Sequence, residues 1–147
     1  PLYSSAASDV YKRQGTNVMN EAFLDRFRVY LVKYLAPEKE VEVLMGRYDS
    51  RGLSKPLAEK MVEIANLIRS AFTREEIRSS FSMRRLFDWI EQTIRHAKNP
   101  KYPIALDRVL YAAEAVIFSK IPVTEDVEVI KNLITKVLGA KFKAPIE

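Results

Sequence analysis

The chain of 147 residues is 48% hydrophobic, which is enough for one domain with a buried core. Its formal charge of +5 is spread along the sequence without a block of like charge, which favours a soluble protein over a dedicated nucleic-acid binder. The absence of cysteine excludes disulfides, thiolate zinc sites and cysteine nucleophiles, and no apolar run approaches the ~18 residues that a membrane helix needs. We therefore expect a soluble, cytoplasmic protein.

Residues 1–14 differ in character from the rest of the chain. They show neither the alternation of a strand nor the apolar stripe of a helix, and from Ser4 to Gln14 they resemble a translated sequencing-adapter read. They also lack the basic start and the apolar stretch of a signal peptide. We expect this segment to be a disordered artefact, with the true sequence beginning near Gly15, inside a domain whose earlier part is missing.

A short buried strand is predicted at residues 28–34. From Arg28 to Tyr34 the sequence is almost continuously apolar and rich in β-branched and aromatic types, which is typical of a strand in a parallel sheet. No second strand is predicted to pair with it, so we expect the backbone groups of Val29 to Val32 to lack a ladder.

Five helices are predicted in series after this strand. Pro37 suits the first position of a helix, and two glutamates in the opening turn suit its positive end. Apolar residues spaced by three and four from Leu57 to Phe72 predict a strongly amphipathic helix. The expected segments are Pro37 to about Met45, Ser54–Phe72, Ser82–His96 with Ser82 as its cap, Ile104–Ser119, and a last helix capped by Thr124 and stopped by Gly139.

Residues 73–81 are ambiguous between two structures. Thr73 and Glu76 are spaced as in a capping box, whereas the run that ends at Phe81 is typical of a loop. In the following helix, Trp89 is expected to pack in the core. His96, the chain's single histidine, is expected at the surface near the negative end of that helix and not as a metal ligand.

The triplet Asp25-Arg26-Phe27 is the first candidate for chemistry. It precedes the predicted strand, so Arg26 would leave the core at its edge, where a neighbouring subunit can reach it. The planar guanidinium binds a phosphate through two hydrogen bonds and keeps its charge when partly desolvated. The simpler interpretation is an ion pair between Asp25 and Arg26 that caps a helix end.

The triplet Ser82-Met83-Arg84 is the second candidate. The Ser82 cap leaves Arg84 in the first turn of a helix, where the positive end of the dipole disfavours a cation. An arginine that is kept at such a position is a candidate for function. Arg85 is its immediate neighbour, and the sequence does not distinguish the two.

In their order, these segments resemble the closing third of an AAA+ ATPase of the MoxR and cobaltochelatase-subunit kind. Leu24 to Phe27 and Pro37 to Val43 look like that family's junction between core and lid, and the helix of Trp89 resembles the cobaltochelatase-subunit lid. The expected fold is mainly α: a helical lid domain preceded by one orphan β-strand of a truncated α/β core. The expected domains are 15–35 for the end of the core and 36–140 for the lid, with residues 141–147 as a tail.

The resemblance implies a ring-forming ATPase, usually a hexamer, that remodels a target together with a partner bearing a von Willebrand factor A domain. ATP and magnesium would be clamped between adjacent subunits. Arg26 would be an arginine finger that acts in trans, and Arg84 the sensor-two residue of the lid. None of the chain's four glycines sits in a phosphate-binding loop, and the Walker B acid is also missing, so we expect this chain alone not to hydrolyse ATP.

Two other functions stay open at this point. The chain could be an independent helical interaction module in which both arginines are ordinary surface residues. It could also be a helical nucleic-acid-binding domain, which only the basic balance suggests; a steep salt dependence of duplex binding would favour it.

Overall fold

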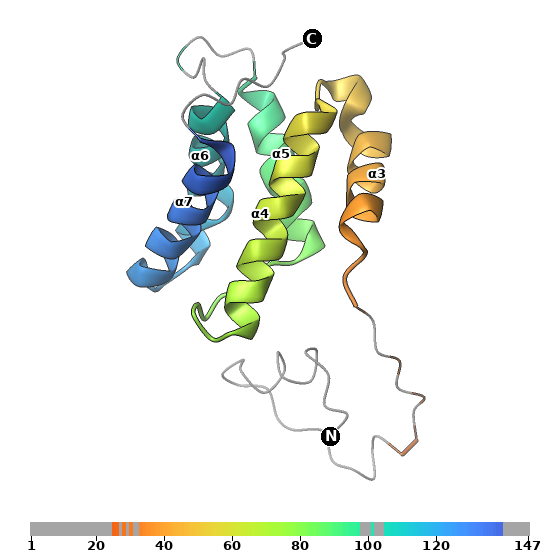
Figure 1. Ribbon diagram of the computed structural model, residues 1–147, viewed down its shortest axis with the longest axis vertical. Coiled ribbons are helices and arrows are strands. Elements are labelled where there is room, and N and C mark those ends of the chain that lie inside the picture. Colours follow the sequence, from red (N-terminus) through yellow and green to blue (C-terminus); the bar gives the residue numbers. More distant parts are fainter. Residues whose placement is uncertain are drawn as a thin grey trace. The chain divides into compact units, whose positions relative to one another are not determined.

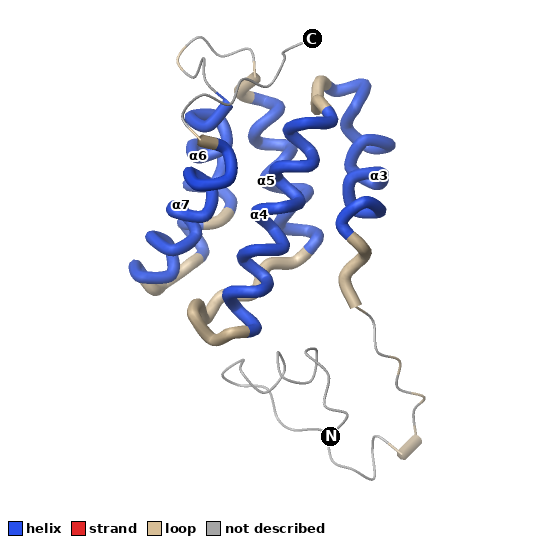
Figure 2. The backbone as a smooth tube through the Cα atoms, viewed as in Figure 1, coloured by secondary structure: helices blue, strands red, loops and turns tan. Residues whose placement is uncertain are grey.

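The computed structural model describes residues 25, 26, 28, 30, 33–97, 101 and 105–139. The chain divides between Leu35 and Ala36 into two units, which are considered separately. The second unit is mainly helical (Figures 1 and 2). Its elements are α3 (Pro37–Tyr48), the 3-10 turn η1 (Asp49–Arg51), α4 (Lys55–Thr73), α5 (Met83–Arg95), α6 (Ala105–Val116), the 3-10 turn η2 (Phe118–Lys120) and α7 (Thr124–Leu138).

Helix α4 is the centre of this unit. It packs against α3 on one side and against α5 and α7 on the others, while α6 contacts both α5 and α7 (Figure 1). The apolar stripe that predicts α4 explains these contacts, because its residues are completely buried against the neighbouring helices: Met61, Ile64, Ala65 and Ile68. A helix with so wide an apolar face needs partners on more than one side.

Trp89 ties α5 to α6 within the core. Its side chain is fully buried and its indole Nε1 donates a hydrogen bond to the carbonyl oxygen of Val109 at 2.9 Å. The ring of Phe81, from the loop before α5, packs edge-on against it at a centroid distance of 6.1 Å. The predicted core position of Trp89 is confirmed, and the indole N–H has the partner that a buried Trp requires.

The predicted helix ends are mostly confirmed. Pro37 begins α3, although this helix runs to Tyr48 and not to about Met45. Ser82 caps α5 through its side-chain oxygen, and Gly139 follows the last residue of α7. The predicted cap at Thr124 is wrong. The extended backbone that an N-cap requires lies one residue earlier, at Val123, so Thr124 is the first residue inside the helix.

After Thr73, the ambiguous segment 73–81 is a loop. Thr73 ends α4, and its hydroxyl donates to the carbonyl oxygen of Arg69 at 3.0 Å, so it does not start a new helix. Glu75 has φ 63°. The loop is fastened to α7 by the backbone N–H of Arg78, which donates to the buried Asp126 carboxylate at 2.8 Å.

The predicted strand is not observed at the positions that the structure describes. Arg28, Tyr30, Lys33 and Tyr34 are not in a strand and are all exposed, with Tyr30 76% exposed. Val29, Leu31 and Val32, the apolar part of that prediction, lie outside the described residues. The described parts of the chain therefore show a helical protein in which the strand stays a prediction.

Candidate functional site

Arg26 lies in a turn with Asp25, and both side chains are exposed. The ion pair that the simpler interpretation expects between them is not formed, and no other ion pair of the described residues involves either side chain. Phe27, the third member of the triplet, lies outside the described residues. Arg26 therefore offers a solvent-facing guanidinium in the first unit.

Arg84 is the second residue of α5, in the second unit, and its side chain is exposed. Within the part of the chain that the structure describes, its guanidinium makes no hydrogen bond and no ion pair. A cation near the positive end of a helix has an unfavourable position unless an anion is present. The geometry at Arg84 thus suits an anionic ligand.

Arg85 is occupied by the protein itself. Its Nη1 donates to the carbonyl oxygen of Ser80 at 3.1 Å, its side chain is half-buried, and this burial lowers the pKa of its guanidinium. Its backbone N–H donates to Ser82 Oγ at 3.3 Å and so completes the cap of α5. Of the two neighbouring arginines that the sequence could not distinguish, Arg84 is the one available to a ligand.

Arg69 of α4 contacts the start of α5, the helix that carries Arg84. Arg69 Nε donates to the carbonyl oxygen of Phe81 at 3.1 Å, and Nη2 lies 3.5 Å from Met83 Sδ. These are the residues on either side of the Ser82 cap. Arg69 therefore fixes the backbone from which α5 starts, and with it the place where Arg84 leaves the helix.

Arg69 is itself paired with Glu40 of α3. Its Nη1 lies 2.8 and 2.9 Å from the two carboxylate oxygens, with Glu40 0% and Arg69 8% exposed. Asn66 Oδ1 accepts a further hydrogen bond from the same nitrogen at 2.9 Å. From its place in the opening turn, Glu40 is one of the two glutamates predicted to suit the positive end of the helix, and no buried partner is predicted for it. The missed signal was its place on the stripe that continues through Leu44 and Tyr48, both fully buried.

Comparison with protein-family models, with curated proteins and with solved structures gave no match. None of the helices in the described part of the chain is long and apolar enough to cross a membrane. No group of three or more His, Cys, Asp or Glu side chains suited to a metal ion occurs among the described residues.

Proposed function

We propose that this chain carries the lid of a ring-forming AAA+ ATPase of the MoxR and cobaltochelatase-subunit kind, with Arg84 as the lid residue that contacts the nucleotide. One observation carries the proposal: Arg84, in the first turn of a helix capped by Ser82, has an exposed guanidinium that pairs with none of the described residues. A γ-phosphate would supply the negative charge that this position lacks. The planar guanidinium can donate two hydrogen bonds to it.

Arg26 is the proposed finger, acting on the ATP of a neighbouring subunit. Its side chain is exposed and forms no ion pair with Asp25, so Asp25 does not compete with a phosphate for its guanidinium. An arginine supplied to a γ-phosphate in this way contributes ~10³ to 10⁵ in rate in well-studied nucleotide hydrolases. The proposal places ATP and magnesium against a nucleotide-binding core that the described residues do not include.

The buried pair of Glu40 and Arg69 gives the lid sensor its precision in this proposal. A catalytic cation must be held close to its productive position, because small displacements of a positioned charge weaken its effect on the transition state. Arg69 does this indirectly, through Phe81 and Met83. It is a positioning residue and does not itself face solvent.

The ring and the partner are parts of the same proposal. The family resemblance implies a homo-hexamer that works with a protein bearing a von Willebrand factor A domain. A finger that acts in trans has a function only where subunits meet, so assembly of the ring is required for the proposed role of Arg26.

The test begins with the longer in-frame sequence of the gene. A Gly-x-x-x-x-Gly-Lys-Ser/Thr loop upstream of Gly15 supports the proposal, and its absence from the complete reading frame overturns it. In the full-length protein, Arg26→Ala and Arg84→Ala should each lower ATP turnover by about two orders of magnitude or more, with Arg26→Ala leaving nucleotide binding nearly intact.

Arg95→Ala is the matched control, because Arg95 is an exposed arginine on the same helix that is paired with Glu91. Its turnover should equal that of the wild type. If an assembled ring of Arg84→Ala turns over ATP as fast as Arg95→Ala does, Arg84 is not the sensor.

A further inference from the structure

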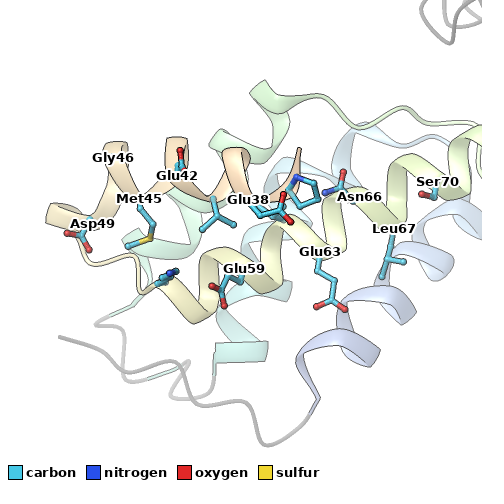
Figure 3. A pocket seen from close by; sticks show the side chains of 14 residues that line it. Glu38, Glu42, Met45, Gly46, Asp49, Glu59, Glu63, Asn66, Leu67 and Ser70 are labelled. Atoms are coloured by element: carbon cyan, nitrogen blue, oxygen red, sulfur yellow. The ribbon is translucent and has the colours of Figure 1, made fainter. Parts of the chain in front are cut away.

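A groove of about 1000 Å³ runs between α3 and α4 (Figure 3). Its lining residues among those described belong to α3, the turn η1 and α4, and none of them belongs to α5, α6 or α7. Its apolar surface comes from Pro37, Val41, Met45, Val62 and Leu67. Val62 is buried, while Val41, Met45 and Leu67 are only half-buried. The groove therefore keeps apolar surface in contact with solvent along the length of α3.

The charged side chains of the groove are almost all acidic. They are Glu38, Glu42 and Asp49 from the α3 side, Glu59 and Glu63 from α4, and a single cation, Lys55. Five carboxylates against one ammonium give the lining a formal charge of −4, on a chain whose total is +5. The groove thus has the opposite sign to the protein as a whole.

Two of these carboxylates are partly neutralised by lysines beside the groove. Lys39 lies 2.7 Å from Glu42, and Lys60 lies 2.9 Å from Glu63. Among the described residues, the other three, Glu38, Asp49 and Glu59, form no ion pair. Counting both lysines still leaves the lining at −2.

Among the described residues, no three of these carboxylates are grouped as a metal site. Figure 3 shows them spread along the two helices instead. An extended row of separated acids beside an apolar strip matches an extended ligand with basic groups at intervals. The 12 residues of α3 span roughly 18 Å, about three turns of a second helix laid alongside.

We propose that this groove binds a basic amphipathic helix of a partner protein, with the partner's apolar stripe against Val41, Met45 and Leu67 and its lysines or arginines toward Glu38, Asp49 and Glu59. Helix-in-groove recognition uses this combination: apolar anchors supply affinity, and opposite charge at the rim supplies orientation and a fast encounter. The inference does not depend on Arg26 or Arg84 and stands whether or not the chain serves an ATPase.

The experiment uses the full chain and a fluorescently labelled synthetic peptide of about four turns, with leucines at i, i+3, i+4 and i+7 and lysines on both flanks. Fluorescence anisotropy should show saturable binding that weakens as salt is raised. Glu59→Lys should weaken binding about tenfold or more, because it turns an attraction into a repulsion. Met45→Gln should also weaken it, by removing apolar contact from the lining of the groove.

Glu128→Lys is the matched control, since Glu128 is an exposed glutamate on α7, outside the groove. Circular dichroism checks that each variant keeps its helices. The proposal is overturned if Glu59→Lys and Glu128→Lys bind the peptide equally, or if a peptide with glutamates in place of lysines binds as tightly. It also fails if sedimentation shows a dimer that Met45→Gln dissociates, because the groove would then belong to a second copy.

Discussion

Glu40 and Arg69, 29 residues apart in the sequence, form a buried ion pair in which one guanidinium nitrogen lies 2.8 and 2.9 Å from the two carboxylate oxygens. The pair joins α3 to α4, and the other nitrogens of Arg69 reach Phe81 and Met83 at the entrance to α5. Three helices are therefore connected through one charged side chain. Removal of the Arg69 side chain should lower the stability of the fold and shift the position of Arg84.

Glu40→Gln should destabilise the folded chain by about 3–5 kcal/mol. The substitution leaves the Arg69 cation buried without its counter-charge, which costs far more than the net contribution of the intact pair. Urea unfolding followed by circular dichroism measures the loss. Glu42→Gln is the control, because the exposed pair of Glu42 with Lys39 contributes at most about 1 kcal/mol. Equal losses in the two variants would contradict the importance of the buried pair.

Ser82→Ala should cost about 0.5–2 kcal/mol, because the backbone N–H of Arg85 loses the oxygen that caps α5. Thr124→Ala is the comparison at α7, where Thr124 lies inside the helix and the cap residue, Val123, makes no side-chain cap bond. Its effect should stay within about 0.5 kcal/mol. Thermal unfolding of both variants measures the two losses of stability. A larger loss in Thr124→Ala than in Ser82→Ala would show that the helix starts are assigned wrongly.

Gly139→Ala and Gly46→Ala should change stability in opposite directions. Among the described residues, and apart from its chain neighbours and own helix backbone, a Cβ at either glycine meets no atom within 4 Å, so only the backbone distinguishes them. Gly139 has φ 65° and ψ 159°, a conformation nearly confined to glycine, and the substitution should cost about 1–3 kcal/mol. Gly46 lies within α3, where alanine should stabilise the chain by roughly 0.5–1 kcal/mol. Denaturant midpoints of the two variants on opposite sides of the wild type would confirm this.

Glu91 should contribute a pH-dependent term to stability. Hydrogen bonds from Arg95 at 3.1 Å and from Arg51 at 3.4 Å lower the pKa of its carboxyl below the ordinary value of 4.5. Because the folded pKa is the lower one, the stabilisation is present above pH 4.5 and is lost as the pH falls through the lowered pKa. Unfolding of wild type and Glu91→Gln across this acid range should show the extra loss only in the wild type.

The same pKa can be followed by an NMR titration of the Glu91 side chain. Arg95→Gln removes the larger cause and should move the pKa back toward the ordinary value. A titration curve that is unchanged in this variant would show that the ion pair is not formed in solution.

Much of the helical structure was predictable from local pattern. The three-and-four spacing of apolar residues in α4, the Ser82 cap, the Pro37 start and the Gly139 stop each depend on side chains a few residues apart. The prediction of Thr124 as a cap was wrong for a local reason too. Capping residues and first-turn residues have similar compositions, and only the backbone angles show that the cap is Val123 and not Thr124.

The candidate site was predictable only as residue types. Sequence alone named Arg84 but could not separate it from Arg85, since both follow the same cap. The difference arises because the Ser80 carbonyl folds back within reach of Arg85 and leaves Arg84 in solvent.

By itself the sequence determined which segments are helical and which of their faces are apolar, because these depend on neighbours within one or two turns. The tertiary structure alone decided that Glu40 meets Arg69, that Asp126 meets the backbone of Arg78, and that the acids of α3 and α4 border one groove. Each of these contacts joins residues far apart in the chain. Their partners are set by how the helices pack, and that is a property of the whole core.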